Sequence, residues 1–262
     1  MGIDRAFNGT AEEYAKQAIG PRARDRIKIA YVRAAETIAA DIEAGRLVRK
    51  DGFFDYVAAD SARTAAEIVL TNVLQKARDD YEEKKADRLG ELFAFIARRD
   101  DIRPAHGNRL VELAGRLTYQ QLLWLGFFSL DETHRSGMRD WESTGAFTPD
   151  EQAFVGDTME LVQLGLLHRQ DLRRVVDYTR LNPRQLKTLL DGALLVEGMS
   201  LTEAEPADVR ALTAVLDRLG RLDGDVQSNR VETIGIPGTD PGSRVQLRYQ
   251  AYRFQPIDES EL

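Results

Sequence analysis

Cysteine is absent from this 262-residue chain. Without it, the chain can form no disulfide bond, carry no thiolate nucleophile and hold no cysteine-ligated zinc ion. Independence from disulfides suits the reducing interior of a cell, and we therefore expect a cytoplasmic protein.

Histidine and long apolar runs are also scarce. The three histidines, His106, His134 and His168, lie in separate segments without the His-Glu-x-x-His spacing of metal sites. The longest apolar candidate, Leu122–Phe128, falls short of the ~18 residues that a membrane helix needs. We expect no metal, no cofactor and no membrane span.

Positive charge is in deficit across the chain. There are 36 Lys and Arg side chains against 43 Asp and Glu, which gives a net charge of -7 and a pI of about 5.2. Because phosphate binding needs clustered Lys and Arg, this balance opposes a broad surface for nucleic acid or anionic lipid. Only a local basic patch would support nucleic-acid binding.

The composition that remains is that of a folded protein. Hydrophobic residues make up 43% of the chain and charged residues 30%, enough to build a real core. Apolar spacings of three and four residues predict a mainly α-helical fold that starts with a helical bundle over residues 11–117. The helix expected at 22–45 has the apolar side Ile27, Tyr31, Ala35, Ile38 and Ile42.

A second long helix is expected after a cap at Asp60 or Ser61. Its apolar stripe comprises Ala65, Val69, Val73, Ala77 and Tyr81. The charged run Asp79–Lys85 then predicts a solvated face. Periodicity leaves open whether the helix at 61–98 is broken near Lys85.

Residues 118–222 are expected to form a winged-helix-like domain. Thr118 is placed to cap a strongly apolar helix, whose Trp124, Phe127 and Phe128 we interpret as core. The pattern Thr148–Glu151 predicts the start of another helix, with a capping box and proline at the first helical position.

Glycines and a proline indicate where the later elements of this region begin and end. Gly165 suits a left-handed stop for the helix that starts near 149, and a short strand is expected at Leu166–Leu167. The segment 192–198 is interpreted as a returning strand. A last helix is expected over Pro206–Leu219.

Residues 223–262 are expected to form a β-hairpin and tail. The alternation of Val245, Leu247, Tyr249 and Ala251 fits a strand, and Gly235–Ser243 fits the turn before it. No Gly-Lys-Ser/Thr ending follows, so we do not interpret these glycines as a phosphate loop. The exposed edge of such a hairpin can pair with another chain.

Catalytic residues are not evident. Asp131, Glu132 and His134 lie close together in a polar loop, where catalytic groups can occur, but no nucleophile or oriented partner accompanies them. We assign no catalytic residue and lean against an enzyme. An enzyme with an unrecognised site would show a deep polar pocket with perturbed acids.

Charge is segregated within the winged-helix-like region. The helix expected at 149–164 contains no Lys or Arg, and its charged residues are Asp150, Glu151, Asp157 and Glu160. A DNA-reading helix exposes donors to bases and phosphates, whereas this helix would be repelled by a duplex.

A basic segment follows immediately. Two acids, Asp171 and Asp177, are outnumbered there by candidate contact residues Arg169, Arg173, Arg174, Arg180, Arg184 and Lys187. The overall charge favours contact with an acidic surface of another copy or another protein. Contact of a basic wing with DNA phosphates is the alternative.

Four sequence runs carry a resemblance to known proteins. They are "DGFFD" (51–55), "YEEKKADRLGELFAFIA" (81–97), "LTYQQLLWLGFF" (117–128) and "DTMELVQLGLL" (157–167). Residues 50–220 resemble a group of uncharacterised bacterial helical proteins and, more distantly, the Abi-alpha type of phage-resistance protein. The resemblance implies a mostly helical cytoplasmic protein of antiviral defence that acts through macromolecular contacts, and it transfers no catalytic motif.

The sequence therefore predicts a non-enzymatic interaction or regulatory protein that acts through protein-protein contacts, including self-association. A DNA-binding regulator that uses the basic segment from Arg169 to Lys187 is the alternative. The acidic helix before Gly165 favours the first.

Overall fold

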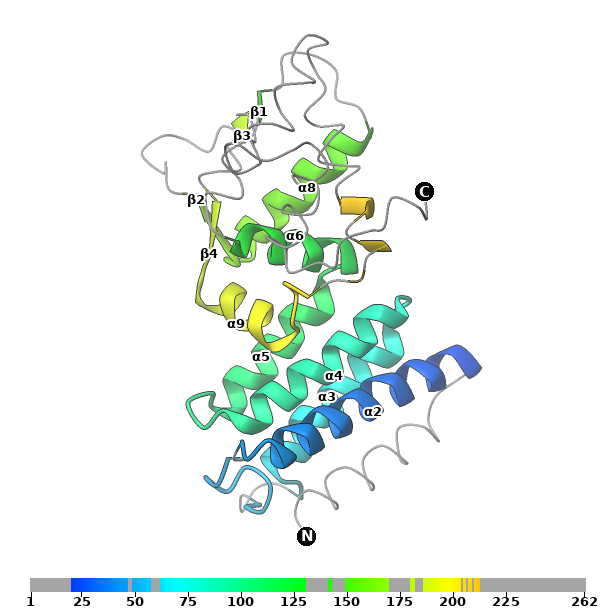
Figure 1. Ribbon diagram of the computed structural model, residues 1–262, viewed down its shortest axis with the longest axis vertical. Helices are drawn as coiled ribbons and strands as arrows, with labels where there is room; N and C mark the ends of the chain where they lie inside the picture. The colour runs from blue at the N-terminus through cyan, green and yellow to red at the C-terminus, as the bar shows by residue number, and fades with distance from the viewer. Residues whose placement is uncertain are drawn as a thin grey trace. The chain divides into compact units, whose positions relative to one another are not determined.

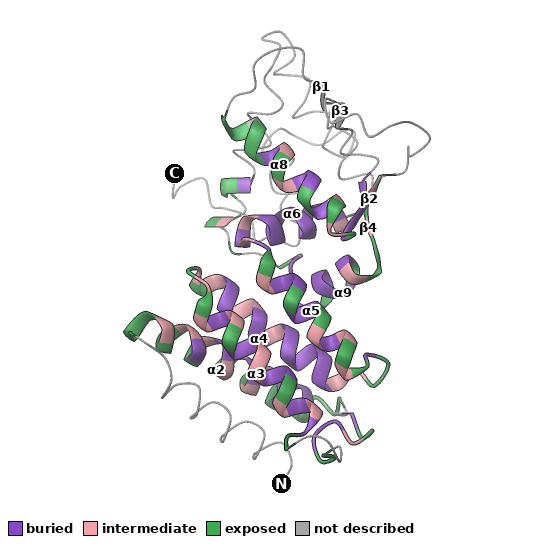
Figure 2. Ribbon diagram, turned by 180° about the vertical axis from the view of Figure 1, so that it is seen from behind, coloured by how far each residue is buried: buried purple, intermediate pink, exposed green. Residues whose placement is uncertain are grey.

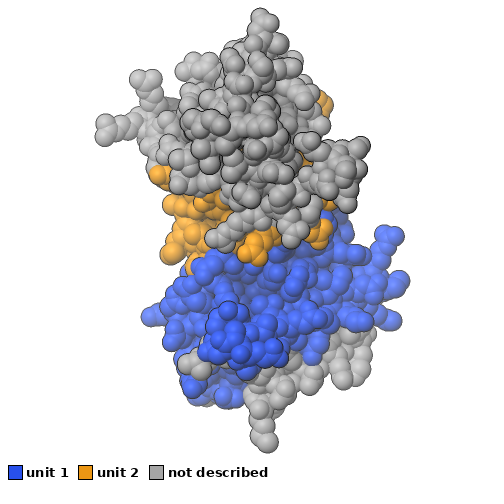
Figure 3. Space-filling view, viewed as in Figure 1, with its two compact units in different colours: residues 1–119, 197–200 blue, residues 120–196, 201–262 orange. Residues whose placement is uncertain are grey.

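The computed structural model describes residues 20–46, 49–57, 62–130, 141–142, 149–169, 180–181, 186–203, 205, 207–208 and 210–212. These residues are mainly helical, as the sequence predicts (Figure 1). The chain divides into two compact units, which Figure 3 distinguishes by colour: residues 1–119 with 197–200, and residues 120–196 with 201–262. No helix in the described part of the chain combines the length and apolar character needed to cross a membrane.

Unit 1 is a bundle of four described helices: α2 (Pro21–Glu43), α3 (Ala65–Asp79), α4 (Glu83–Arg98) and α5 (Pro104–Arg116). Helices α3 and α4 each contact all three of the other helices. Helices α2 and α5 each contact α3 and α4. The position of α4 explains why buried side chains occupy most of its circumference, including Leu89, Leu92, Phe93, Phe95 and Ile96. The bundle core is thus built around α4.

The packing of α2 corrects the predicted apolar side. Its buried residues are Ile27, Ala30, Ala34, Ile38 and Asp41, whereas the predicted Ile42 is 51% exposed. Alanines face α4 because the two backbones approach closely at Gly90. A Cβ on Gly90 would lie 2.3 Å from the carbonyl oxygen of Ala30. A side chain the size of tyrosine has no room in such a contact.

The start of α3 differs from the predicted cap at Asp60 or Ser61, residues that lie outside the described part of the chain. The helix begins at Ala65, and Thr64 forms its cap. The Thr64 hydroxyl accepts a hydrogen bond from the Glu67 amide at 3.2 Å, and the Glu67 carboxylate accepts one from the Thr64 amide at 2.6 Å. Two reciprocal bonds satisfy more terminal donors than a single cap, so the boundary lies at this complete capping box.

A break between α3 and α4 resolves the question left open at Lys85. Helix α3 ends at Asp79 and α4 begins at Glu83. The Asp80 carboxylate shapes the turn by accepting hydrogen bonds from the amides of Tyr81 at 2.8 Å and Glu82 at 3.0 Å. Such side-chain bonds to a following backbone replace the helical ladder.

Lys85 contradicts the prediction that this charged run is solvated. Its side chain is buried, and the ammonium group lies 2.5 Å from the Asp80 carboxylate and donates to the Gly115 carbonyl at 3.1 Å. A buried ion is tolerated when it is paired and hydrogen-bonded in this way. Lys85 thereby connects the α3–α4 turn to the end of α5.

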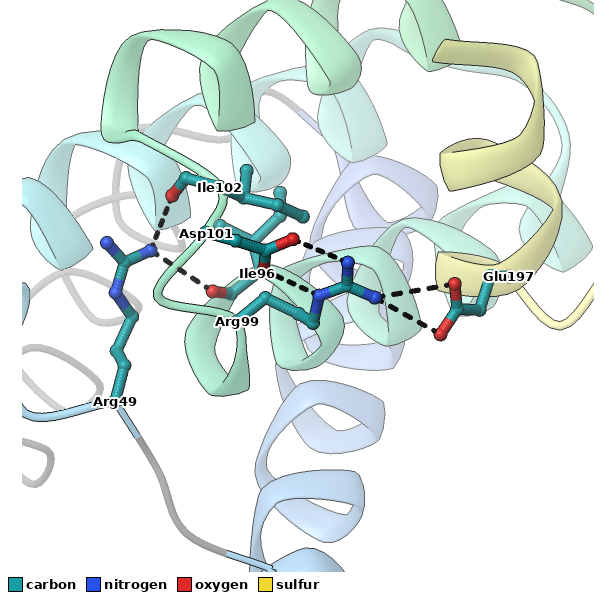
Figure 4. Close-up of polar contacts among 6 residues, drawn as sticks. All are labelled: Arg49, Ile96, Arg99, Asp101, Ile102 and Glu197. Atoms are coloured by element: carbon teal, nitrogen blue, oxygen red, sulfur yellow. Dashed lines mark hydrogen bonds and ion pairs between the residues drawn. The ribbon is translucent and has the colours of Figure 1, made fainter. Parts of the chain in front are cut away.

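Two arginines hold the connection between α4 and α5 (Figure 4). Arg49 is buried, pairs with Asp51, and donates to the carbonyls of Ile102 at 2.7 Å and Ile96 at 3.4 Å. Its hydrogen bond to Asp51 lowers the pKa of that carboxyl below its ordinary value. Arg99 pairs with Asp101 at 2.6 Å and with Glu197, in the 197–200 segment of unit 1, at 3.4 Å.

Unit 2 starts within α6 (Tyr119–Ser129) and includes α8 (Pro149–Gln163) and most of α9 (Leu190–Gly198). Its short strands are β1 (Trp141–Glu142), β2 (Leu167–Arg169), β3 (Arg180–Leu181) and β4 (Leu186–Thr188). They form two antiparallel pairs, β1 with β3 and β2 with β4. Gly165 has φ 70° and ends α8 in the left-handed conformation that the sequence predicts.

The strand predicted at 192–198 is wrong, because this segment lies in α9. A short apolar run does not distinguish a buried strand from a buried helix. Packing decides in favour of the helix: a Cβ on Gly192 would lie 2.3 Å from the Leu166 carbonyl oxygen, so the first turn of α9 rests directly on the backbone after α8. In the predicted helix 206–219, the described residues 207–208 and 210–212 are helical. The predicted hairpin and tail at 223–262 lie outside the described residues.

Replacement of Lys85 by methionine keeps the apolar stem but leaves the Asp80 carboxylate buried without its partner. We expect Lys85→Met to lower the free energy of unfolding by about 3–5 kcal/mol in chemical denaturation. The exposed Lys28 on α2 provides the matched control, and Lys28→Met should stay within about 0.5 kcal/mol of the parent. Addition of Asp80→Asn to Lys85→Met should recover part of the loss, and equal effects at positions 85 and 28 would contradict the buried pair.

Substitution of alanine for glycine is expected to have opposite effects on stability at two helical positions, 90 and 156. Gly90→Ala should destabilise unit 1 by about 1–3 kcal/mol, because the new methyl group meets the Ala30 carbonyl and the helices must separate. Gly156→Ala on α8 meets nothing within 4 Å and should stabilise the protein by about 0.5–1 kcal/mol through helix propensity. Denaturation curves of the two variants test the contrast, which disappears if α2 and α4 are not in close contact.

Candidate functional site

The orientation of α8 is set by an aromatic contact with α6. The Phe154 ring lies 4.7 Å from Trp124 and 6.3 Å from Phe128, measured between ring centroids. Trp124, Phe127 and Phe128 are all buried, which confirms their interpretation as core. Because Phe154 points into this cluster, one side of α8 is committed to the interior.

The exposed surface of α8 is the candidate docking face. Its exposed residues are Pro149, Asp150, Gln152, Ala153, Gly156, Glu160 and Gln163, which we call the α8 face. Exposed and buried residues alternate along the helix in Figure 2. No Lys or Arg occurs between residues 149 and 163, so cations that bind this face must come from outside the helix.

A glutamine from α6 reaches the carboxylates at the edge of this face. The buried Gln121 donates its amide hydrogens to Asp157 at 3.1 Å and to Glu160 at 2.7 Å. Asp157 and Glu160 stand three residues apart, so they lie on the same side of the helix. A neutral amide therefore bridges two acids, and the cluster keeps its negative charge.

Burial raises the pKa of the Asp157 carboxyl above its ordinary value. The hydrogen bond from Gln121 acts in the opposite direction, the negative charge of Glu160 raises the pKa further, and a hydrogen bond with Trp124 lowers it. Burial outweighs these bonds because it disfavours the charged carboxylate. Asp157 therefore takes up a proton more readily in the folded protein than in the unfolded chain.

The arrangement accepts hydrogen bonds and attracts cations, but it contains no nucleophile with an adjacent base. Within the described ranges, no group of three or more His, Asp or Glu side chains is placed to hold a metal ion. The polar loop residues Asp131, Glu132 and His134 lie outside those ranges. The exposed carboxylates of the α8 face are groups that can accept hydrogen bonds and attract positive charge.

The predicted basic contact residues are divided between two sheets. Arg169 is in β2 opposite Leu186, and Arg180 is in β3 opposite Glu142. Lys187 is exposed in β4 and lies opposite His168. Arg173, Arg174 and Arg184 lie outside the described residues. The register thus brings His168 beside Lys187, and it does not place Arg180 on the same strand pair.

Two features of this unit escaped the sequence analysis. Gln121 gave no signal, because only the packing of α6 on α8 brings it to the acids. Leu189 and Leu190 are 40% and 71% exposed at the start of α9. Their adjacency gave no usable signal, because consecutive apolar residues such as Leu194 and Leu195 are both buried in the same helix.

No family model, curated protein or solved structure matches the chain. The chemistry of its own residues is therefore the basis for assigning a function.

The raised pKa of Asp157 gives a signed pH dependence. Protonation favours the folded state, so the contribution of Asp157 to stability is present at low pH and is lost as the pH rises above 3.8, the ordinary value, through the higher folded pKa. The free energy of unfolding of Asp157→Asn, relative to the parent, should therefore improve as the pH rises through this range. Denaturation measured at a series of pH values tests the slope.

Gln121→Leu provides the opposite case, because it removes a donor that favours the charged carboxylates. Its destabilisation relative to the parent should grow with pH. Parallel pH profiles for the parent and both variants would contradict the role of burial and of the Gln121 bridge.

Proposed function

We propose that the protein is a non-enzymatic interaction protein that binds a positively charged protein surface through the α8 face. The observation that carries this proposal is the absence of Lys and Arg from α8, whose exposed acids include Asp150 and Glu160. Complementary charge speeds association and excludes partners of like charge. The face therefore favours a basic protein surface and disfavours a duplex.

Two finer features belong to the same proposal. The order of α6, α8, Gly165, β2 and β4 supports a winged-helix-like unit that has become a protein-docking module. A role in bacterial antiviral defence is supported by the resemblance of residues 50–220 to the Abi-alpha type. Loss of phage protection on removal of the protein from its host tests that role independently of the docking surface.

DNA binding is the second candidate, and one observation favours it. Lys187 is exposed on β4 beside His168, in a segment where Arg and Lys outnumber acids. A duplex affinity that falls steeply with salt and collapses in the double variant Arg173→Glu, Arg174→Glu would support this function over protein docking.

Site-specific crosslinking distinguishes the two candidates. A photoreactive amino acid replaces Gln152, which is exposed on the α8 face, and a second protein carries it at Lys28 on α2. We expect irradiation in cells to give protein adducts at position 152 that resist nuclease, and few adducts at position 28.

Charge reversal supplies the specificity control. The adducts at position 152 should decrease when Asp150→Lys is added, because the reversed charge repels a basic partner. Nucleic-acid adducts at position 152, or no adduct at all, would contradict the proposed function.

A further inference from the structure

Unit 2 carries a second exposed surface, which follows β4. Lys187, Leu189 and Leu190 are exposed there, and we call these three residues the hairpin patch. Leu190 is 71% exposed. Adjacent exposed leucines beside a cation are typical of a protein-binding surface, because solitary globular domains rarely leave apolar residues clustered in water.

The local backbone prevents these leucines from turning inward. The Leu189 amide donates to the Leu166 carbonyl at 2.9 Å, and Gly192 contacts the same carbonyl oxygen. These contacts fix the first turn of α9, which buries Leu194 and Leu195 and leaves the side chain of Leu190 outside. The patch is therefore presented by a fixed backbone, a property that lowers the entropic cost of binding.

The charges of the two surfaces are complementary. The hairpin patch carries the Lys187 ammonium, whereas the α8 face carries the carboxylates of Asp150 and Glu160 and no Lys or Arg. Lys187 forms no ion pair with any residue that the structure describes. Lys187 is exposed, and its ammonium is the positive charge of the hairpin patch.

We propose that the hairpin patch of one copy binds the α8 face of a second copy. This inference rests on the proposed function and names its partner: the basic protein surface that α8 binds belongs to another molecule of the same chain. Lys187 meets the acids of α8, and Leu189 and Leu190 cover the uncharged positions Ala153 and Gly156. Every molecule supplies both surfaces, so the partner is present at the concentration of the protein itself.

A contact between two different surfaces of the same chain is heterologous, and it either closes into a ring of copies or continues as an open assembly. The net charge of -7 makes two copies repel each other elsewhere. Association therefore depends on the local match between the hairpin patch and the α8 face. Substitutions at these two surfaces test that match more directly than the salt dependence of association does.

The mass of the full-length protein in solution tests the inference. Light scattering over a wide concentration range should give a mass above that of one chain. Leu190→Asp and Lys187→Glu, both at exposed positions, should weaken association roughly tenfold or more. Ile42→Asp on α2, where the parent side chain is 51% exposed, is the matched control and should leave the mass unchanged.

A charge exchange identifies the two surfaces that meet. The double variant Asp150→Lys, Gln152→Lys should also be deficient alone, and mixing it with Lys187→Glu should restore association between the two variants. A single-chain mass at all concentrations overturns the inference. So does unchanged association of Leu190→Asp, or failure of the folded variants to associate on mixing.

Crosslinking at position 152 separates this inference from the proposed function. If the protein is monomeric and forms nuclease-resistant adducts with a different protein, self-association is refuted and the proposed docking function stands. If the protein binds duplex DNA and forms no protein adduct, both self-association and the proposed docking function are refuted.

Discussion

The rotation of α8 about its own axis decides what unit 2 offers to other molecules. Phe154 fixes this rotation by entering the aromatic cluster of Trp124, Phe127 and Phe128 on α6. Aromatic rings bury a large apolar area and prefer defined mutual angles, so they restrict both position and rotation. Glu160 lies about 120° from Phe154 around the helix and is exposed, and Asp150 is exposed in the first turn of α8. Core packing therefore leaves acids of α8 at the surface.

Unit 1 shows how a small bundle keeps charges inside. The Lys85 ammonium is paired with Asp80, the Asp41 carboxylate is paired with Arg46 and Arg98, and the Arg49 guanidinium is bound to Asp51 and to backbone carbonyls. Each buried ion has a partner and hydrogen bonds, which is the condition under which its loss of hydration is offset. These charges join loops and helices of unit 1 to one another.

The two surfaces of unit 2 have a common origin in the turn after α8. Gly165 reverses the chain, β2 and β4 pair, and Gly192 brings α9 back onto the carbonyl of Leu166. This compact connection leaves an acidic helix on one side of the turn and an exposed cation with two leucines on the other.

The sequence by itself determined the helical class, the core role of Trp124 and its neighbours, the stop at Gly165 and the lack of cations in α8. These follow from local rules: apolar spacing, left-handed glycine and composition. Tertiary structure decided which residues of α2 are buried, that Lys85 is internal, that 192–198 is helical and that Gln121 bridges two acids. Periodicity locates an apolar stripe only to within a residue or so, whereas the shape and charge of the neighbouring element select among adjacent positions. That selection depends on residues distant in the chain, such as Gly90 for Ala30 and Gly115 for Lys85, and no local pattern contains it.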